Sequence, residues 1–245
     1  MDHGYLSEIF ASFQGEGSHV GERHLFVRLA ICNLRCRYCD TPDSLVRTSH
    51  CTICRAGQEP RRVSNPISRR ELVGYTSAFL ESEGPIDAIA VTGGEPLVQA
   101  EFLAAFLSHA RFPVPILLET NGVLPEKLAL VLPWIGIISM DIKPPSNTGE
   151  AAFWDEHEEF LRVADGKEIY VKVLVDRTTS DADIARAAAL VAAHGDVPMY
   201  LQPIMDAAHR PEIDGSTLTR LFAIARQHHA RVRVLPQTHK LLGIQ

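Results

Sequence analysis

Long hydrophobic runs are missing from this sequence. The longest apolar stretch covers 11 residues, from Leu128 to Ile138, and contains Pro133, whereas a membrane-spanning helix needs about 20 apolar residues. The N-terminus, MDHGYLSEIF, shows no basic stretch followed by an apolar core, so no secretory signal is visible. We therefore expect a protein that neither crosses a membrane nor is exported.

An excess of positive charge is also missing. The chain has 24 Lys and Arg residues against 30 Asp and Glu residues, a formal net charge of −6, and this balance predicts no strong affinity for nucleic acid. Apolar residues make up 46% and charged residues 22%, as in ordinary globular proteins. No repeat or long linker divides the 245 residues, so we expect a single domain over residues 1–245.

Cysteine is scarce, and its placement is informative. The five cysteines all lie between positions 32 and 54. Their odd number and low density exclude a disulfide-stapled scaffold. A chain that confines its thiols to so short a segment is expected to use them for chemistry, in a reducing cytoplasm.

Strand and helix patterns alternate along the chain. Residues 99–110, 181–194 and 216–229 carry apolar residues at three- and four-residue intervals, which is typical of helices. Ser68 and Glu71 have the spacing of a capping box at the start of another helix. Seven β-rich runs are predicted to form strands: His24–Ala30, Ile86–Val91, Ile116–Glu119, Ile135–Asp141, Ile169–Val175, Met199–Pro203 and Arg231–Leu235.

This alternation predicts an α/β fold with a mostly parallel sheet. Seven strands are fewer than the eight of a closed barrel, so an open, partial TIM-type β/α barrel fits better. Polar residues follow the first three strands, where barrel enzymes place their active sites. The segment from about 42 to 67, with three prolines, several arginines and Cys51 and Cys54, is interpreted as an irregular insertion beside the site.

Cys32, Cys36 and Cys39 have the spacing C-x3-C-x2-C. Three thiolates this close can hold one iron–sulfur cluster and leave one iron without a protein ligand. Two alternatives are three thiols without metal, and a structural zinc site formed by Cys36 and Cys39 with Cys51 and Cys54.

Together with Gly93-Gly94-Glu95-Pro96 after the second strand, the triplet resembles the radical S-adenosylmethionine (SAM) superfamily. The resemblance implies a [4Fe–4S] cluster on Cys32, Cys36 and Cys39, with SAM bound to the open iron. One-electron reduction then cleaves SAM to a 5′-deoxyadenosyl radical. The two glycines could also serve a purely structural role in a tight strand-to-helix turn, and this role is compatible with cofactor binding.

Further motifs resemble one family within this superfamily, the 7-carboxy-7-deazaguanine synthases. They occur in order over nearly the whole chain: Glu8–Gly17, Phe26–Leu29, Cys39–Thr41, Thr92–Leu97, Glu119–Gly122, Asp141–Pro145, Gln202–Pro203 and Gln237–Lys240. The implied reaction is a radical rearrangement of 6-carboxy-5,6,7,8-tetrahydropterin to 7-carboxy-7-deazaguanine with loss of ammonia, as used for queuosine and related compounds. The resemblance also implies a flavodoxin or ferredoxin as electron donor, and we expect a homodimer.

The resemblance assigns substrate contacts to two groups of residues. The loop of Phe13, Gln14, Gly15 and Glu16 is expected to read the edge of the pterin ring, and Arg28 to pair with the substrate carboxylate. Thr92 is expected to add a contact, and His239 with the carboxylate of Gln245 to close the pocket. The alternatives are a decorated surface turn, a surface arginine and a solvated tail histidine.

The expected SAM contacts lie at the cluster loop and at later strand ends: Tyr38, Cys39, Asp40, Gly94, Glu95, Asp141, Ile142, Lys143, Gln202 and Pro203. Lys143 could instead be an ordinary strand-end lysine. Thr41 matches the position that binds Mg2+ in this family. No catalytic side chain is expected beyond the cluster and the cofactor radical.

Two observations stay open. Cys51 and Cys54 could form a shared metal site or a redox pair, or be ordinary thiols, and we favour no catalytic role. The rival functions are a glycyl-radical activase, which shares the cysteine triplet, and a non-enzymatic zinc-binding interaction protein. Gln14–Gly17 and His239-Lys240 favour a small heterocyclic substrate over a polypeptide.

Overall fold

A ten-stranded sheet organises the computed structural model, which describes residues 1–244. The sheet has the order β12-β11-β10-β9-β8-β7-β3-β2-β4-β5. Its strands are β2 (Leu6–Phe13), β3 (Arg23–Leu29), β4 (His50–Cys54), β5 (Arg61–Ser64), β7 (Ala88–Gly93), β8 (Ile116–Thr120), β9 (Ile137–Ile142), β10 (Glu168–Val175), β11 (Met199–Pro203) and β12 (Val232–Val234). A small separate sheet pairs β1 (His3–Gly4) with β6 (Ile67–Ser68).

The strands β3 and β7 to β12 run parallel to one another. They correspond to the seven predicted strands, with shifts of a few residues at their ends. Within residues 1–244 the outermost strands β12 and β5 pair with no further strand, so the sheet is open. The predicted partial barrel is therefore confirmed.

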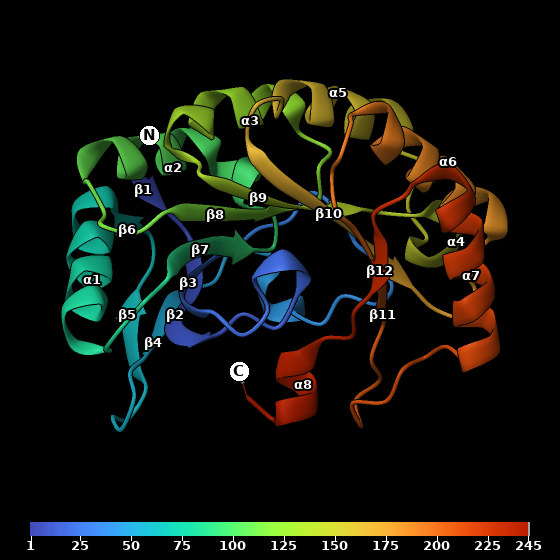
Figure 1. The fold of residues 1–245 in the computed structure, drawn as a ribbon. Coiled ribbons are helices and arrows are strands. Elements are labelled where there is room, and N and C mark those ends of the chain that lie inside the picture. The colour runs from blue at the N-terminus through green and yellow to red at the C-terminus, as the bar shows by residue number, and fades with distance from the viewer. Residues whose placement is uncertain (245) are drawn as a thin grey trace.

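Helices cover the outer face of the curved sheet, as Figure 1 shows. The helices are α1 (Arg69–Ser82), α2 (Ala100–His109), α3 (Pro125–Val131), α4 (Pro145–Thr148), α5 (Trp154–Val163), α6 (Asp181–Ala193), α7 (Gly215–His228) and α8 (Thr238–Leu242). The short α8 lies apart from the others, on the inner side of the sheet. The predicted capping box is present at the start of α1, where Ser68 and Glu71 each bind the other's backbone N–H.

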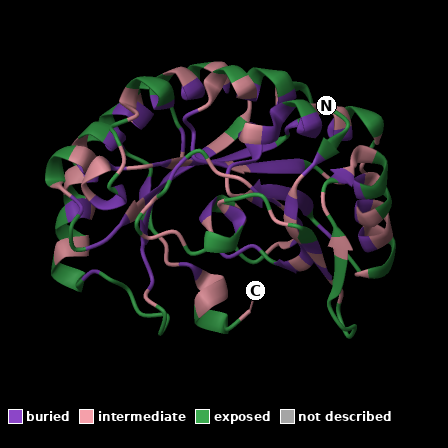
Figure 2. Ribbon diagram, turned by 180° about the vertical axis from the view of Figure 1, so that it is seen from behind, coloured by how far each residue is buried: buried purple, intermediate pink, exposed green. Residues whose placement is uncertain are grey.

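Most residues of the central strands are buried, as Figure 2 shows. On β3 and β7, alternate residues such as Val27 and Ile89 pack against the helices in the main core. The intervening residues, such as Phe26 and Ala90, belong to a smaller cluster that fills the inside of the partial barrel. This second cluster also holds Phe10 of β2 and leaves the carboxyl ends of the strands free for polar groups.

Two regions differ from the sequence analysis. Residues Leu6–Phe13, for which no strand was predicted, form β2, which pairs antiparallel with β3. The interpretation of residues 42–67 as irregular is wrong over His50–Ser64, where β4 and β5 form a hairpin that joins the sheet beside β2. The hairpin gave a weak strand signal because β4 has only five residues and β5, RRVS, is exposed at three of its four positions. No helix within residues 1–244 is long and apolar enough to span a membrane.

Candidate active site

A cavity of about 390 Å³ opens at the carboxyl ends of the parallel strands. It is lined by most of the residues that the sequence analysis selected: Phe13, Gln14, Gly15, Glu16, Arg28, Cys32, Cys36, Tyr38, Cys39, Asp40, Thr41, Thr92, Gly94, Glu95, Asp141, Lys143, Gln202 and His239. Ile142 and Pro203 do not line it and are buried in β9 and β11. Gln245 lies outside the described residues. The structure thus gathers motifs from most of the chain's length around one space.

The cysteine loop leaves β3 through a strained residue. Ile31 has a φ of 77°, a conformation that a β-branched residue rarely adopts and that costs about 1–3 kcal/mol. Its carbonyl accepts a hydrogen bond from the backbone N–H of Glu95 at 2.9 Å, and Cys32 N–H donates to the carbonyl of Leu45 at 3.2 Å. These bonds hold the turn that presents the Cys32 thiol to the cavity.

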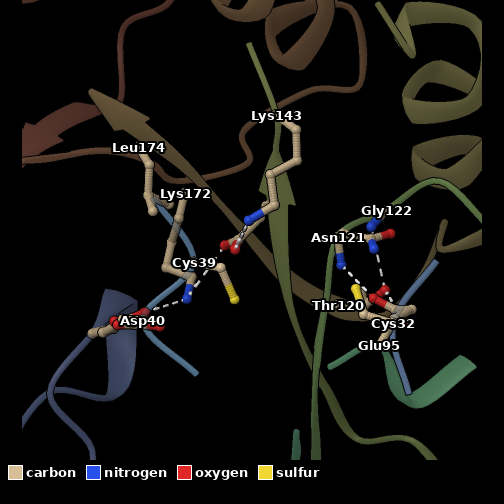
Figure 3. Close-up of polar contacts among 12 residues, drawn as sticks. Cys32, Cys39, Asp40, Glu95, Thr120, Asn121, Gly122, Lys143, Lys172 and Leu174 are labelled. Atoms are coloured by element: carbon tan, nitrogen blue, oxygen red, sulfur yellow. Dashed lines mark hydrogen bonds and ion pairs between the residues drawn. The ribbon is translucent and has the colours of Figure 1, made fainter. Parts of the chain in front are cut away.

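The three thiols of the cysteine loop line the cavity, and Cys36 is close enough to both Cys32 and Cys39 to interact with them electrostatically. In Figure 3, Cys32 lies beside Glu95 and Thr120, while Cys39 lies near Asp40 and Lys172. Burial, with Glu95 nearby, raises the pKa of Cys32 to about 11. Without a bound cation this thiol therefore stays protonated at neutral pH, and a metal centre would have to displace its proton.

Gly93 packs on the end of β3, and Gly94 packs on residues that flank the cysteine loop. Gly93 has a φ of 144°, and a Cβ on it would lie 2.1 Å from the carbonyl oxygen of Leu29. A Cβ on Gly94 would lie 2.5 Å from the carbonyl oxygens of Ile31 and Ser44. Both obstacles are backbone atoms that cannot rotate away, so glycine is required here.

Glu95 is fully buried at the end of this turn. Its carboxylate accepts hydrogen bonds from the backbone N–H of Asn121 at 2.8 Å and of Leu97 at 3.0 Å, and from the Thr120 hydroxyl at 2.9 Å. Burial nevertheless raises the pKa of Glu95 to about 7. The hydrogen bonds therefore fix the position of the carboxylate, while a pKa of about 7 means that its charge changes near neutral pH.

A lysine–aspartate pair stands at the end of β9. The Lys143 ammonium lies 2.9 Å from Asp141 Oδ2 and 5.7 Å from the centre of the Tyr38 ring. Burial opposes the charged form, but Asp141 raises the pKa of Lys143 well above its usual range. The Lys143 side chain is only 11% exposed, which is unusual for an ordinary strand-end lysine.

A buried ion pair holds the loop after β2 in place. The Glu16 carboxylate pairs with the Lys172 ammonium and accepts a hydrogen bond from the Gln237 amide at 2.7 Å. Burial opposes the ionisation of Glu16, but Lys172 and Gln237 hold its pKa well below its usual range. Gln14 is buried and donates to Glu119 at 2.9 Å. The alternative of a decorated surface turn is therefore wrong.

Arg28 reaches the cavity from β3. Its Nε donates to Glu8 Oε1 at 2.6 Å, and its guanidinium lies 5.8 Å from the centre of the Phe10 ring, which stacks on Phe26. The side chain is 18% exposed, so it is not a surface charge. The ion pair and the aromatic ring together fix the direction in which the guanidinium points.

The segment around α8 closes one side of the cavity. Thr238 N–H donates to the carbonyl of Gly15 at 3.0 Å, and the Lys240 ammonium lies 2.8 Å from Asp40. The His239 ring packs so closely on Gly15 that a Cβ there would lie 2.1 Å from its Nδ1. His239 is therefore packed into the site, which contradicts the alternative of a solvated tail histidine.

Cys51 and Cys54 lie away from the cavity, on β4. Cys51 is buried in the main core, whereas Cys54 packs against the smaller cluster inside the barrel. Positions three apart on a strand face opposite ways, so the two thiols do not form a redox pair. Within residues 1–244 no three His, Cys, Asp or Glu side chains are arranged to hold a metal ion, so the four-thiol zinc site is not formed.

Several cavity residues were missed or given no role. Lys172 lies within the apolar run of β10, and Glu119 and Gln237 lie in matched motifs to which no contact was assigned. Glu8 and Lys240 likewise line the cavity. A lysine in the middle of an apolar run, as in IYVKVLV, was the available signal for Lys172.

Comparisons with known proteins give a consistent result. The radical SAM superfamily matches residues 27–165. The chain is 37% identical to a 7-carboxy-7-deazaguanine synthase from Geobacter sulfurreducens, over 97% of this chain and 96% of that protein. A protein of the same name from Methanopyrus kandleri is 36% identical over 96% of this chain and 92% of its own length.

Among solved structures, QueE from Escherichia coli superposes with a TM-score of 0.57 at 21% sequence identity, covering 96% of this chain and 94% of that one. At this identity the likeness concerns the fold. It agrees with the open sheet and its outer helices.

Proposed function

The chain belongs to the 7-carboxy-7-deazaguanine synthase family of the radical SAM superfamily, and on that premise we propose that it converts 6-carboxy-5,6,7,8-tetrahydropterin to 7-carboxy-7-deazaguanine with loss of ammonia. One observation carries the proposal at the level of the site. A single cavity joins the cysteine loop to Glu16 and Arg28, so a substrate held by these two side chains faces the cluster-binding loop.

The donor set of the cysteine loop fits a [4Fe–4S] cluster. Cys32, Cys36 and Cys39 line one cavity, and three thiolates at this spacing suit a polynuclear centre with one iron left open. When bound, the cluster and SAM supply radical chemistry that removes hydrogen from an unactivated carbon.

Two buried polar atoms at the cavity also fit a bound cofactor. The Tyr38 hydroxyl and Gln202 Oε1 are buried and make no hydrogen bond to the described residues. Buried polar atoms without partners are uncommon in folded proteins, and a ligand can satisfy them. We propose that they contact SAM together with Cys39, Asp40, Gly94, Glu95, Asp141 and Lys143, while Ile142 and Pro203 contribute only backbone position.

The substrate side of the cavity can orient a flat heterocycle. The Glu16 carboxylate is an acceptor for the paired N–H groups at the amino end of the pterin, with Gln14 and Gly15 beside it. The Nε of Arg28 is engaged by Glu8, which leaves its two terminal amino groups for a two-pronged bond to the substrate carboxylate. Phe13, Thr92 and His239 complete this side, and Gln245 stays a prediction.

Magnesium is a further part of the proposal. Thr41 lies at the cavity beside Asp40, and Mg2+ prefers oxygen ligands but keeps several waters or substrate oxygens. The protein alone offers too few ligands, so we propose that the substrate carboxylate completes the site. Titration of the substrate-bound enzyme with Mg2+ tests this, because Thr41→Val should weaken the binding of Mg2+.

The partners and location complete the proposal. All five cysteines are free, and the cluster ligands must stay reduced, which favours a reducing cytoplasm. A flavodoxin or ferredoxin would deliver the electron. The homodimer stays a prediction.

Anaerobic turnover tests the proposal directly. The reconstituted enzyme, reductant, SAM and 6-carboxytetrahydropterin should together yield ammonia and the deazapurine, and omission of SAM should stop both. A brown protein that forms neither product would contradict the substrate assignment and favour the rival of an enzyme that activates a glycyl radical. A colourless zinc protein would contradict the radical chemistry.

A further inference from the structure

Lys172 is a buried lysine that belongs to none of the sequence motifs. Its side chain is 5% exposed, and it lies on β10 directly opposite Asp141 on β9. The ammonium pairs with Glu16 and lies 3.3 Å from Asp141 Oδ1. Figure 3 shows Lys172 and Lys143 pointing toward the same part of the cavity from neighbouring strands.

The two partners of Lys172 belong to different parts of the cavity. The cofactor half comprises the loop of Cys32–Thr41 with Gly93–Glu95, Asp141, Lys143 and Gln202. The substrate half comprises Gln14–Glu16, Arg28, Gln237 and His239. Glu16 and Asp141 come from segments more than 120 residues apart, and Lys172 touches both.

We propose that Lys172 is a positioning residue for this reaction: its ammonium fixes the Glu16 carboxylate as an acceptor for the N–H groups of the substrate and ties it to Asp141 beside the cofactor. The identity of the substrate in this inference rests on the proposed function. Lys172 itself acts through Glu16 and Asp141.

The charges around Glu16 explain why a cation is needed there. Glu16 faces Lys172, Gln237 and His239, with the Asp40 carboxylate also nearby. Lys172 in turn faces Asp141, Glu119 and Tyr170. Removal of the Lys172 ammonium leaves Glu16 buried among carboxylates with an amide as its hydrogen-bond donor, and both burial and like charge favour protonation.

Protonation would change what Glu16 can recognise. An ionised carboxylate accepts hydrogen bonds at both oxygens, whereas a carboxylic acid donates from one of them. Two N–H groups of a pterin edge would then meet a donor. A variant without the Lys172 ammonium should therefore bind the substrate more weakly at acidic pH values at which Glu16 of the wild type stays ionised.

Three variants separate positioning from general damage. Lys172→Met removes the charge at similar volume, and Lys172→Arg keeps it. Lys127→Met is a matched control, because Lys127 makes a comparable ion pair with Glu101 on the surface, away from the cavity. Thermal denaturation of each variant reports whether it is folded.

The substrate affinity of the anaerobic holoenzyme is measured with SAM present and reductant absent, from about pH 6 to pH 8. We expect Lys172→Met to bind 6-carboxytetrahydropterin at least about tenfold more weakly than wild type at pH 6, with a smaller loss at pH 8. Lys172→Arg should stay within a few-fold of wild type, and Lys127→Met should match it. An unchanged affinity, or a loss of equal size at every pH, would overturn the role in fixing Glu16.

The affinity for SAM, measured without pterin, tests the link to Asp141 separately. A few-fold weaker affinity in Lys172→Met supports the link, and an unchanged affinity overturns it. If the wild-type protein binds no carboxytetrahydropterin, the proposed function is wrong, and the SAM measurement alone then decides whether Lys172 positions Asp141.

Discussion

The cofactor half and the substrate half of the cavity are built in different ways. Besides the Lys143–Asp141 ion pair, the cofactor half is shaped by backbone contacts between segments that carry motifs, such as the packing of Gly94 on the carbonyls of Ile31 and Ser44. The substrate half depends on side-chain charges that join distant segments, such as Glu16 with Lys172 and Gln237, 156 and 221 residues further along the chain. Backbone packing gives the cofactor half a fixed shape, whereas the substrate half depends on its charge balance.

Loss of a cluster ligand should have the largest effect. Cys36→Ser removes one of three thiolates, so we expect loss of the brown colour and of all product formation. The measurement is the iron content and visible absorption of the anaerobically reconstituted protein. Cys54→Ser, outside the cavity, should keep both; a Cys36→Ser protein with full iron and activity would contradict the ligand assignment.

A methyl group in the cofactor half should destabilise the fold itself. Gly94→Ala places a Cβ 2.5 Å from two backbone carbonyl oxygens, and we expect a loss of about 2–3 kcal/mol in the free energy of unfolding. Chemical denaturation measures it.

Gly74→Ala is the matched control. Gly74 lies in α1 with no atom within 4 Å of an added Cβ. The free energy of unfolding of the Gly74→Ala protein should therefore rise by about 0.5–1 kcal/mol. Equal effects of the two substitutions would show that the close packing of Gly94 is unimportant.

Glu95 should give the cofactor half a pH dependence before SAM is bound. Because burial raises its pKa from 4.5 to about 7, the folded chain retains a proton that the unfolded chain releases. Stability from this group is present below pH 4.5 and is lost as the pH rises to about 7.

Glu95→Gln removes this titration. Between pH 4.5 and 7, the free energy of unfolding of the SAM-free wild type should fall by about 3 kcal/mol more than that of the variant. Urea denaturation at several pH values measures both. Parallel pH profiles would mean that Glu95 is already ionised at low pH in the folded protein.

The same difference between the two halves explains what could be predicted from sequence. The parallel strands have continuous apolar runs, and the cysteine and glycine motifs are local, so both were found. Lys172 was missed because its pairing with Glu16 can be recognised only after folding brings β10 and the loop after β2 together. The strand β2 was missed because LSEIFASF mixes polar and apolar residues and pairs with β3 across a register shift.

The site residues show the same limit. Short-range spacing indicates which thiols can share a cluster, but an ion pair across the barrel depends on the tertiary fold. The resemblance to a known family supplied Gln14, Glu16 and Arg28 for the substrate half. It assigned no role to the charges that hold them, such as Glu8 beside Arg28.

The most direct test of a cavity with separate cofactor and substrate halves is Arg28→Ala with two readouts from one anaerobic sample. Formation of 5′-deoxyadenosine from SAM reports the cofactor half, and formation of 7-carboxy-7-deazaguanine reports the substrate half. We predict that slow SAM cleavage and the cluster absorption persist while deazapurine formation is lost. Deazapurine formation at the wild-type rate, or loss of the cluster together with the product, would contradict the account.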